Sequence, residues 1–211
     1  MSKESQKHSS EKAYRLETPQ EHQKFYDDWA DSYESQFVES KGYIYPKKIA
    51  EYFVNHVGLN HNPVIDIGCG TGLVGLALRM NGWNSEIDGV DISHGMLKMA
   101  KAKGVYGNLL KADLTSYEYT PESIYASLIS AGTFTHGHLG PDVLLKVFSY
   151  ARKNAHAVIG INAQHFEKLN FIQAFVKWEE DGIITKPDFE EIEIYESPEK
   201  KLALISDFRI I

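Results

Sequence analysis

Apolar positions follow two different spacings along the chain. Up to residue 57 they recur every three or four residues, which predicts amphipathic helices over about 20–38 and 46–57. From residue 64 onward, short apolar runs alternate with helical stretches. The apolar runs predict strands at 64–67, 87–92, 105–112, 124–131 and 155–161. The helical stretches predict helices at 73–80, 94–104, 143–152 and 165–179.

The order of these segments predicts the sheet. Strands that alternate with helices lie parallel and are joined by right-handed crossovers. The last two apolar runs, 191–195 and 202–210, have only residues 196–201 between them, so they predict an antiparallel hairpin. The fold class is therefore α/β, with a doubly wound, mostly parallel seven-stranded sheet and a C-terminal antiparallel hairpin.

The domain division follows from the same pattern. Residues 1–18 are polar and lack apolar periodicity, so we expect a flexible N-terminal tail there. No linker or internal repeat interrupts the remainder, and we expect residues 19–211 to form one domain. Two helices within 19–60 precede the first strand of that domain.

Composition narrows the possible partners and compartments. Hydrophobic residues make up 43% and charged residues 24% of the 211 positions, which is typical of a soluble globular protein. The formal net charge of −7 disfavours a nucleic-acid partner, because phosphate backbones bind basic surfaces. The single cysteine, Cys69, rules out an internal disulfide and a cysteine-rich zinc site. Without an apolar membrane span or signal peptide, we expect no membrane partner and a cytoplasmic location.

A glycine-rich turn follows the first predicted strand. Residues 66–72 read Asp-Ile-Gly-Cys-Gly-Thr-Gly and lead into a helix, which is the edge of a doubly wound sheet where ligands bind. Asp91 ends the second predicted strand, where a carboxylate can accept hydrogen bonds from ribose hydroxyls. Asp113 ends the third and can accept one from an adenine amine. Three neighbouring strand ends thus carry acceptors suited to a nucleoside.

A dinucleotide site is the competing interpretation. Residues 70–75 also match the pattern G-x-G-x-x-G of nicotinamide-binding proteins. Against it, Asp66 places a carboxylate just before the loop, which would repel a pyrophosphate and attract an ammonium group. The terminal hairpin is also foreign to the usual nicotinamide-binding sheet. An NAD(P)-binding oxidoreductase therefore stays as the alternative.

Several motifs carry a family resemblance. Residues 64–72 resemble motif I of the class I S-adenosylmethionine-dependent methyltransferases. Residues 89–93, followed by Met96, resemble motif II, and 112–114 resemble motif III. Residues 26–33 resemble the Y-D-x-W-A-x-x-Y helix of many small-molecule members. Residues 132–138, together with that helix, resemble the methyltransferase-like proteins of the Williams–Beuren region.

The resemblance implies a Rossmann-like methyltransferase fold, S-adenosylmethionine as cofactor, and lid helices in 19–60 that close over the donor. It implies that the glycines pass beneath the methionine part, that Asp91 holds the ribose, and that Ile92 and Leu114 enclose the adenine. The full set of expected cofactor-binding residues is Trp29, Tyr33, Asp66, Gly68, Cys69, Gly70, Gly72, Asp91, Ile92, Met96, Asp113, Leu114 and Ser130.

The expected enzyme is a methyltransferase that acts on an oxygen or nitrogen atom of a small molecule. Residues 130–133 lack the [DN]-P-P-[YF] sequence of exocyclic-amine methylases, and Cys69 lies inside the donor loop, away from any acceptor. Transfer needs alignment rather than a universal catalytic residue, and His136 is the candidate base. The histidine spacing predicts no metal. A non-catalytic S-adenosylmethionine-binding protein stays open, and the sequence carries no signature of the oligomeric state.

Overall fold

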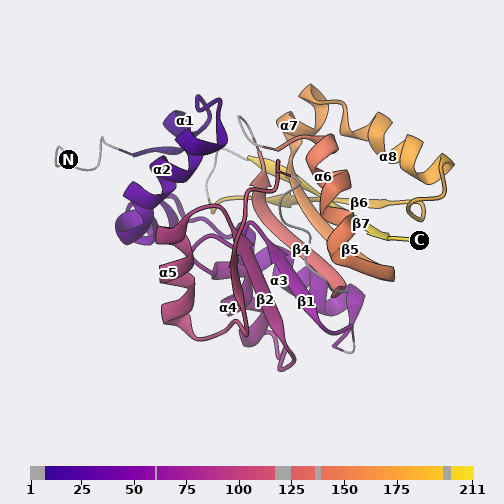
Figure 1. The fold of residues 1–211 in the computed structure, drawn as a ribbon, viewed down its shortest axis with the longest axis horizontal. Helices are drawn as coiled ribbons and strands as arrows, with labels where there is room; N and C mark the ends of the chain where they lie inside the picture. The colour runs from indigo at the N-terminus through magenta and orange to yellow at the C-terminus, as the bar shows by residue number, and fades with distance from the viewer. Residues whose placement is uncertain (1–7, 60, 117–124, 136–138, 197–200) are drawn as a thin grey trace.

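Seven strands and the helices between them form the body of the computed structural model, which describes residues 8–59, 61–116, 125–135, 139–196 and 201–211 (Figure 1). The strands are β1 (Val64–Ile67), β2 (Ile87–Asp91), β3 (Leu109–Lys111), β4 (Tyr125–Phe134), β5 (Ala151–Asn162), β6 (Asp188–Glu193) and β7 (Leu202–Arg209).

The strand order is β3-β2-β1-β4-β5-β7-β6. The five strands β3, β2, β1, β4 and β5 are parallel to one another, whereas β7 is antiparallel to both β5 and β6. The predicted fold class is confirmed, including the terminal antiparallel pair. Strand β7, the last in the chain, is inserted between β5 and β6 and so takes no edge position.

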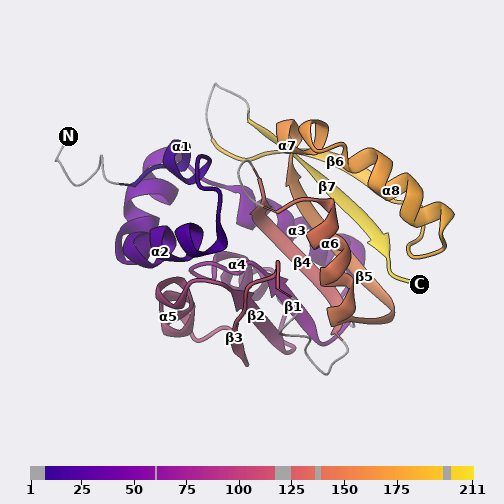
Figure 2. The same ribbon diagram turned by 45° about the horizontal axis from the view of Figure 1, so that its top comes forward.

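Helices cover both faces of the sheet (Figure 2). On one face, α3 (Tyr45–Val57) and α4 (Leu73–Met80) pack apolar side chains such as Phe53 and Leu78 against the strands, and Trp83, just after α4, joins the same core. On the other face lie α6 (Pro141–Val147), α7 (Ala163–Lys168) and α8 (Phe171–Glu180), with Phe171 and Phe175 fully buried. Helix α5 (His94–Lys103) contacts β2 and β3.

The helical segment predicted over 20–38 changes pitch twice. It begins as α2 (Pro19–Trp29), tightens to a 3₁₀ turn over Ala30–Ser32 and widens to a π-helix over Glu34–Glu39. A capping box starts it, because the Thr18 side chain accepts from the N–H of Glu21 and the Glu21 side chain accepts from the N–H of Thr18. This segment lies over α5, at one end of the sheet (Figure 2).

The described part of the predicted tail is partly packed against the domain, although Lys12, Arg15 and Glu17 are exposed. Residues 1–7 lie outside the described residues, but α1 (Ser10–Ala13) is a short helix and Ala13 is buried. The His8 ring stacks on Trp29 with a centroid distance of 6.0 Å. The division into tail 1–18 and domain 19–211 therefore stays a prediction, with contacts across that boundary.

Several predicted elements differ from the structure in extent, among them the last three strands before β7: β4 runs on to Phe134, β5 begins at Ala151, and β6 is Asp188–Glu193 rather than 191–195. The third strand is shorter than predicted, because 105–108 form a turn that Asp88 holds through the N–H of Asn108 at 2.7 Å. The helix predicted over 143–152 ends in a 3₁₀ turn at Phe148–Tyr150, and β5 begins directly after it. The helix predicted over 165–179 breaks at Asn170, which adopts a positive φ of 53° that asparagine tolerates better than most residues.

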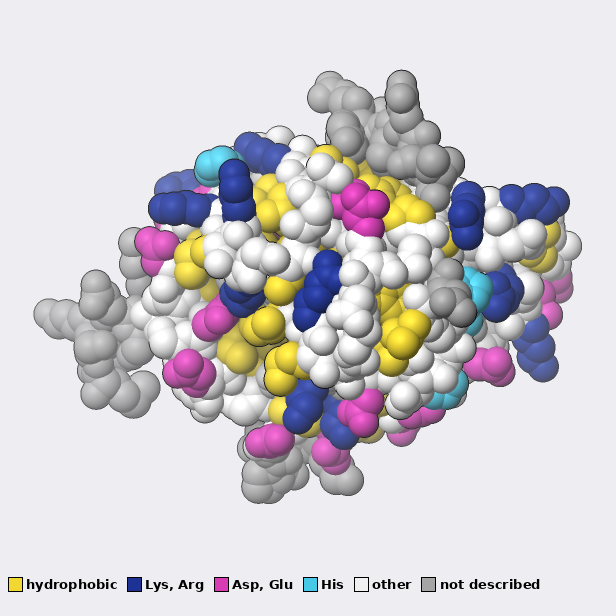
Figure 3. Space-filling model, turned by 90° about the horizontal axis from the view of Figure 1, so that it is seen from below, with side chains coloured by type: hydrophobic (Ala, Val, Ile, Leu, Met, Phe, Trp, Pro, Cys, Tyr) yellow, Lys and Arg dark blue, Asp and Glu magenta, His cyan; other side chains and the backbone are white. Residues whose placement is uncertain are grey.

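Charges of both signs are interspersed on the surface seen from below, with apolar side chains between them (Figure 3). Within the described parts of the chain, no helix combines the length and the apolar character needed to cross a membrane.

Candidate functional site

A cavity of about 270 Å³ lies at the carboxyl ends of β1, β2, β3 and β4. Residues of the glycine loop (68–72), of the turns after β2 and β3, of the end of β4 and of the N-terminal helical segment all line it. This is the edge of the sheet where the sequence predicted a ligand site. The expected residues that line the cavity are Tyr33, Gly68, Cys69, Gly70, Asp91, Ile92, Met96, Asp113 and Leu114.

The glycine loop needs its glycines for two different reasons. Gly68, Gly70 and Gly72 all have positive φ angles, of 67°, 52° and 89°. At Gly68 space is also limiting, because a Cβ built there would lie 2.0 Å from Oγ1 of Thr133. At Gly70 a built Cβ meets no protein atom within 4 Å. The loop backbone can thus approach a bound molecule closely at Gly70.

Asp91 connects β2 to the glycine loop. Its carboxylate accepts hydrogen bonds from the N–H of Gly70 and from the N–H of Ser93, both at 2.9 Å. Burial raises the pKa of Asp91 above its usual value, while these backbone hydrogen bonds act in the opposite direction. The carboxylate lines the cavity and has lone pairs left to accept from hydroxyl groups of a ligand.

Asp66 lies beneath the loop rather than in the cavity wall. It is completely buried, and Oδ2 accepts a hydrogen bond of 2.7 Å from the hydroxyl of Tyr106. Its other oxygen, Oδ1, has no hydrogen-bond partner among the described residues. Burial raises the pKa of Asp66 to about 7. The role of Asp66 toward a cationic ligand group therefore stays a prediction from the sequence.

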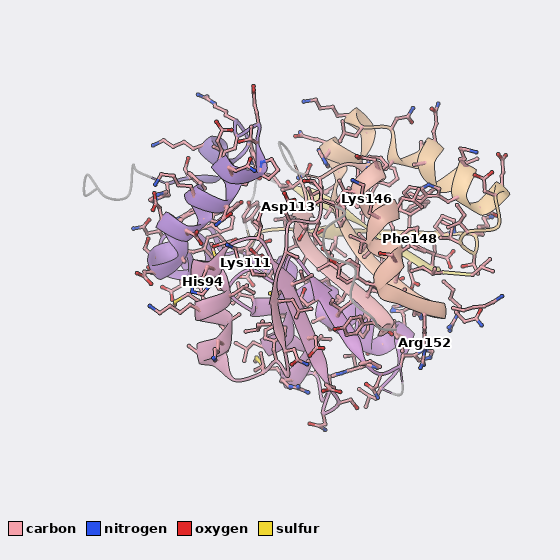
Figure 4. The ribbon with its side chains drawn as sticks, in the orientation of Figure 1. His94, Lys111, Asp113, Lys146, Phe148 and Arg152 are labelled. Carbon is pink, nitrogen blue, oxygen red and sulfur yellow. The ribbon has the colours of Figure 1, made fainter. Side chains whose placement is uncertain are left out.

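Asp113 follows β3 at the upper end of the sheet, with Lys146 on α6 to one side and Lys111 to the other (Figure 4). Its Oδ1 accepts from the N–H and the hydroxyl of Thr115 at 2.8 and 2.7 Å. Lys146 in turn donates to the carbonyl oxygen of Thr115 at 2.8 Å. Helix α6 therefore holds the turn that presents Asp113 and Leu114 to the cavity.

Four expected residues do not line this cavity. The Ser130 hydroxyl donates to the carbonyl oxygen of Ile67 at 2.7 Å and so supports the strand below the loop. A Cβ built on Gly72 would face Tyr106 and Ala100. Asp66 lies underneath, and Trp29 lines a smaller neighbouring cavity. His136, the candidate base, and the nearby His138 lie outside the described residues.

The N-terminal helical segment is attached next to the Asp91 turn. Oδ1 of Asp27 accepts from the Ser93 hydroxyl at 2.7 Å and from the N–H of Gly95 at 2.8 Å. On the other side, Nζ of Lys103 donates to Glu34 at 2.5 Å and to the carbonyl oxygen of Thr71 at 2.7 Å. Two contacts between residues far apart in the sequence thus hold the segment over the cavity.

Sequence reasoning missed several residues of the cavity wall. Glu17 lines it from just before α2, and Pro19 and His22 line it from the first turn of that helix. Thr133 lines it from the end of β4, and Leu139 from just before α6. Tyr106, which bonds Asp66, was also missed, because 40 residues separate the partners and no local pattern joins them. Among the described residues, no group of three or more His, Cys, Asp or Glu is placed to hold a metal ion.

Comparison with known proteins places this geometry in context. Residues 64–156 match a family model described as a methyltransferase domain. Methyltransferase-like protein 27 of Homo sapiens is 34% identical over 118 residues, which cover 54% of this chain and 47% of that protein. Malonyl-[acyl-carrier protein] O-methyltransferase 1 of Ilyobacter polytropus is 30% identical over 158 residues, covering 66% and 56%. The chain spans about half the length of these curated relatives.

Solved structures share the fold at low sequence identity. A TehB-like SAM-dependent methyltransferase from Corynebacterium glutamicum has a TM-score of 0.59 at 17% identity. The match covers 88% of this chain and 98% of that protein. The plantazolicin methyltransferase BpumL, in complex with a monoazolic analog and SAH, has a TM-score of 0.61 at 14% identity and covers 92% and 99%.

Proposed function

Because this chain has the fold of the class I S-adenosylmethionine-dependent methyltransferases and carries a methyltransferase domain over residues 64–156, we propose that it transfers a methyl group from S-adenosylmethionine to an oxygen or nitrogen atom of a small molecule. One observation carries the proposal: Asp91 lines the cavity while it also holds the N–H of Gly70 in the glycine loop. One wall of the cavity thus contains both a carboxylate that can accept hydrogen bonds from a ribose and the loop backbone that would lie against the donor.

The residues present fit the donor. Gly68 and Gly70 would pass beneath its methionine part, and Asp91 would accept from its ribose hydroxyls. Ile92, Asp113 and Leu114 all line the cavity and would surround the adenine. The unpartnered oxygen of Asp66 lies below the loop and would attract the donor's ammonium, directly or through water.

S-adenosylmethionine supplies a methyl group on a positively charged sulfur, which makes that carbon electrophilic. The protein's part is to bind, to align and to exclude water. The N-terminal helical segment serves the last of these, because Tyr26 and Tyr33 line the cavity from above and Asp27 and Lys103 hold the segment in place.

Two alternatives are separated by experiment. The NAD(P)-binding oxidoreductase is not favoured, because residues 64–156 match a methyltransferase domain and β7 is antiparallel within the sheet. A non-catalytic S-adenosylmethionine-binding protein shares every feature of the donor site and differs only in turnover.

Calorimetry with S-adenosylmethionine and with NAD(P) tests the donor. We expect micromolar affinity for the first and no heat from the second; the reverse result would remove the proposal. Labelled S-adenosylmethionine and a metabolite extract then test turnover. Label that moves to a small molecule supports an enzyme, and tight donor binding without transfer supports the non-catalytic alternative.

We keep a cytoplasmic location and a small-molecule acceptor within this proposal. Cys69 is a free, buried thiol, which suits a reducing compartment. The mixed surface charge in Figure 3 and the net charge of −7 support a small acceptor over a nucleic acid. The absence of a metal stays a prediction.

A further inference from the structure

A second, smaller cavity of about 50 Å³ adjoins the donor cavity. The two share the wall formed by Tyr26, Tyr33, Tyr43 and Gly132. Gly132 lies near the carboxyl end of β4 with a positive φ of 84°, and a Cβ built there would lie 2.8 Å from the hydroxyl of Tyr43. The smaller cavity thus meets the donor cavity at the carboxyl end of the central strands, and it has room for a head group of a few atoms.

Hydrogen-bond donors dominate the polar groups of this second cavity. The tyrosines Tyr14, Tyr33, Tyr43 and Tyr195 lie close enough to one another to interact electrostatically. Burial raises the pKa of Tyr33 and of Tyr43 well above the usual value, so their hydroxyls stay protonated at neutral pH and can donate. Trp29 is 2% exposed, and its indole N–H has no hydrogen-bond partner among the described residues.

The charged residues of the second cavity also favour an anionic ligand group. Among the described residues that line it, Lys201 alone carries a formal charge at neutral pH, and it lies at the exposed rim. Neither aspartate nor glutamate belongs to that set. An ammonium group entering here would find aromatic faces but also a lysine and no counter-charge. An anionic oxygen would find protonated hydroxyls, the Trp29 N–H and the lysine.

Resting on the proposed function, we infer that this cavity is the methyl-acceptor subsite and that it takes a carboxylate attached to a small apolar body. In the transfer step, a carboxylate oxygen forms a bond to the methyl carbon while the carbon–sulfur bond breaks and its electron pair stays on sulfur. The products are a methyl ester and a neutral thioether. No proton moves, so the step requires no base, in keeping with a wall of protonated tyrosines.

Binding of three probes with one ring and different head groups tests the inference: phenylacetate, phenylacetamide and phenethylamine. We expect saturable binding of phenylacetate to the whole chain, seen by ligand-observed NMR, and weaker or no binding of the other two. Lys201→Met should raise the half-saturating phenylacetate concentration about tenfold. The matched control Lys177→Met, an exposed lysine on α8 that pairs with Asp181, should leave it unchanged.

Activity gives a second readout. With labelled S-adenosylmethionine, phenylacetate should yield a volatile methyl ester, and Tyr195→Phe, at a residue that lines the smaller cavity but not the donor cavity, should lower its rate while calorimetric donor affinity is kept. Preferential binding or methylation of phenethylamine, or equal phenylacetate binding by the Lys201 and Lys177 variants, would overturn the inference.

The two proposals fail separately in these measurements. If S-adenosylmethionine binds but phenylacetate neither binds nor is esterified, the carboxylate subsite is wrong and the proposed function is unaffected. If S-adenosylmethionine does not bind, the proposed function is wrong, while phenylacetate binding that depends on Lys201 still supports a carboxylate site in this cavity.

Discussion

Two aspartates of the donor site, Asp66 fully buried and Asp91 half-buried, differ in what surrounds them. Asp91 lines the cavity and receives two backbone N–H groups, whereas Asp66 receives one tyrosine hydroxyl and keeps one oxygen without a partner. Both sites raise the carboxyl pKa through burial. Asp91 is therefore suited to direct contact with a ligand. Asp66 can act on a ligand in the glycine loop only through the charge of its carboxylate.

Asp91→Asn should weaken donor binding. The amide keeps one acceptor oxygen but places an NH₂ group among groups that donate, including the N–H of Gly70. Loss of hydrogen bonds to a charged acceptor costs roughly 1–3 kcal/mol, about five- to 150-fold in affinity. Calorimetry with S-adenosylmethionine measures this directly.

Asp88→Asn is the matched control on the same strand. Asp88 accepts from Asn108 at 2.7 Å and from the Tyr125 hydroxyl at 2.8 Å, and it lies outside the cavity wall. This variant should lose stability and keep its donor affinity. Equal donor affinity of the Asp91 variant and the unaltered protein would contradict the ribose assignment.

Asp66→Asn should alter the pH dependence of stability. The pKa of Asp66 rises from 3.8 to about 7 on burial, so the folded state keeps a proton between these values that the unfolded state releases. The free energy of unfolding therefore falls as the pH rises through this window, and the loss is complete above it. Asparagine has no proton to lose, so the variant should lack this decline.

Urea denaturation at about pH 5 and about pH 8 measures the difference. We expect the unaltered protein to lose on the order of 1–3 kcal/mol more than Asp66→Asn between the two conditions. Parallel stability curves for the two proteins would show that Asp66 is ionised in the folded state throughout.

The position of a site residue was predictable where that residue lies at the end of a predicted strand. Asp91 and Asp113 follow strands that the apolar pattern located, so their arrival at one edge of the sheet followed from topology. Tyr106 was not predictable, because its contact with Asp66 depends on how the loop between α5 and β3 packs against β1 and α4. Glu17 and His22 were missed because they are polar positions that belong to no motif.

At the scale of elements, the N-terminal helical segment depends on a few polar contacts. Asp27 bonds the start of α5, and Lys103, at the end of α5, reaches both Glu34 and the glycine loop. Burial opposes ionisation of Asp27, but hydrogen bonds from Gly95 and Ser93 outweigh it and lower the pKa. The Asp27 contribution is thus present above the usual carboxyl pKa and is lost as the pH falls through the lowered value.

Asp27→Ala should loosen this segment without unfolding the sheet. We expect about tenfold weaker donor binding and faster proteolysis within α2, because the carboxylate no longer accepts from Ser93 and Gly95. Limited proteolysis with and without S-adenosylmethionine measures both effects.

The neighbouring residue supplies the control. Asp28 forms an exposed i,i+4 pair with Lys24 at 3.1 Å, and such pairs contribute little. Asp28→Ala should therefore behave like the unaltered protein. Similar protease sensitivity of the two variants would mean that the Asp27 contact does not hold the segment.

Element boundaries show where local patterns stop being sufficient. β1 and α4 begin and end where the apolar pattern and the flanking glycines predict, because both signals are local. The π-helix over Glu34–Glu39 was not predicted, since its apolar spacing also fits an α-helix. The break at Asn170 was missed for the same reason, because the apolar spacing runs through it.

At the scale of the whole molecule, helix α3 packs on the sheet with no space to spare. A Cβ built on Gly160 of β5 would lie 2.1 Å from the Tyr45 hydroxyl and 2.9 Å from Cδ1 of Ile49. That hydroxyl is buried and has no hydrogen-bond partner among the described residues. The close approach of α3 to β5 therefore depends on the missing side chain.

Gly160→Ala should destabilise the protein by roughly 1–3 kcal/mol through overpacking. Adding Tyr45→Phe removes the nearest clashing atom and should recover part of the loss, whereas Tyr45→Phe alone should cost little. A double-mutant cycle by urea denaturation measures the coupling. Strictly additive effects would show that the helix shifts to accommodate the methyl group.

The global layout was predictable because the alternation of strands and helices restricts the topology to few choices. The hairpin of β6 and β7 also followed from spacing alone. The spacing does not indicate which of the two hairpin strands, β6 or β7, pairs with β5. That choice depends on the match between the buried faces of β5 and β7, where Val158, Ile205 and Phe208 lie in the core.

The insertion of β7 between β5 and β6 has a consequence for synthesis on the ribosome. Strand β6 emerges first but can join the sheet only through β7, so the growing chain exposes the open edge of β5 until residue 209 has left the exit tunnel. During that interval the edge offers unpaired amide and carbonyl groups to other nascent chains. Slow translation of residues 163–201 would prolong that exposure and should increase the demand for chaperones.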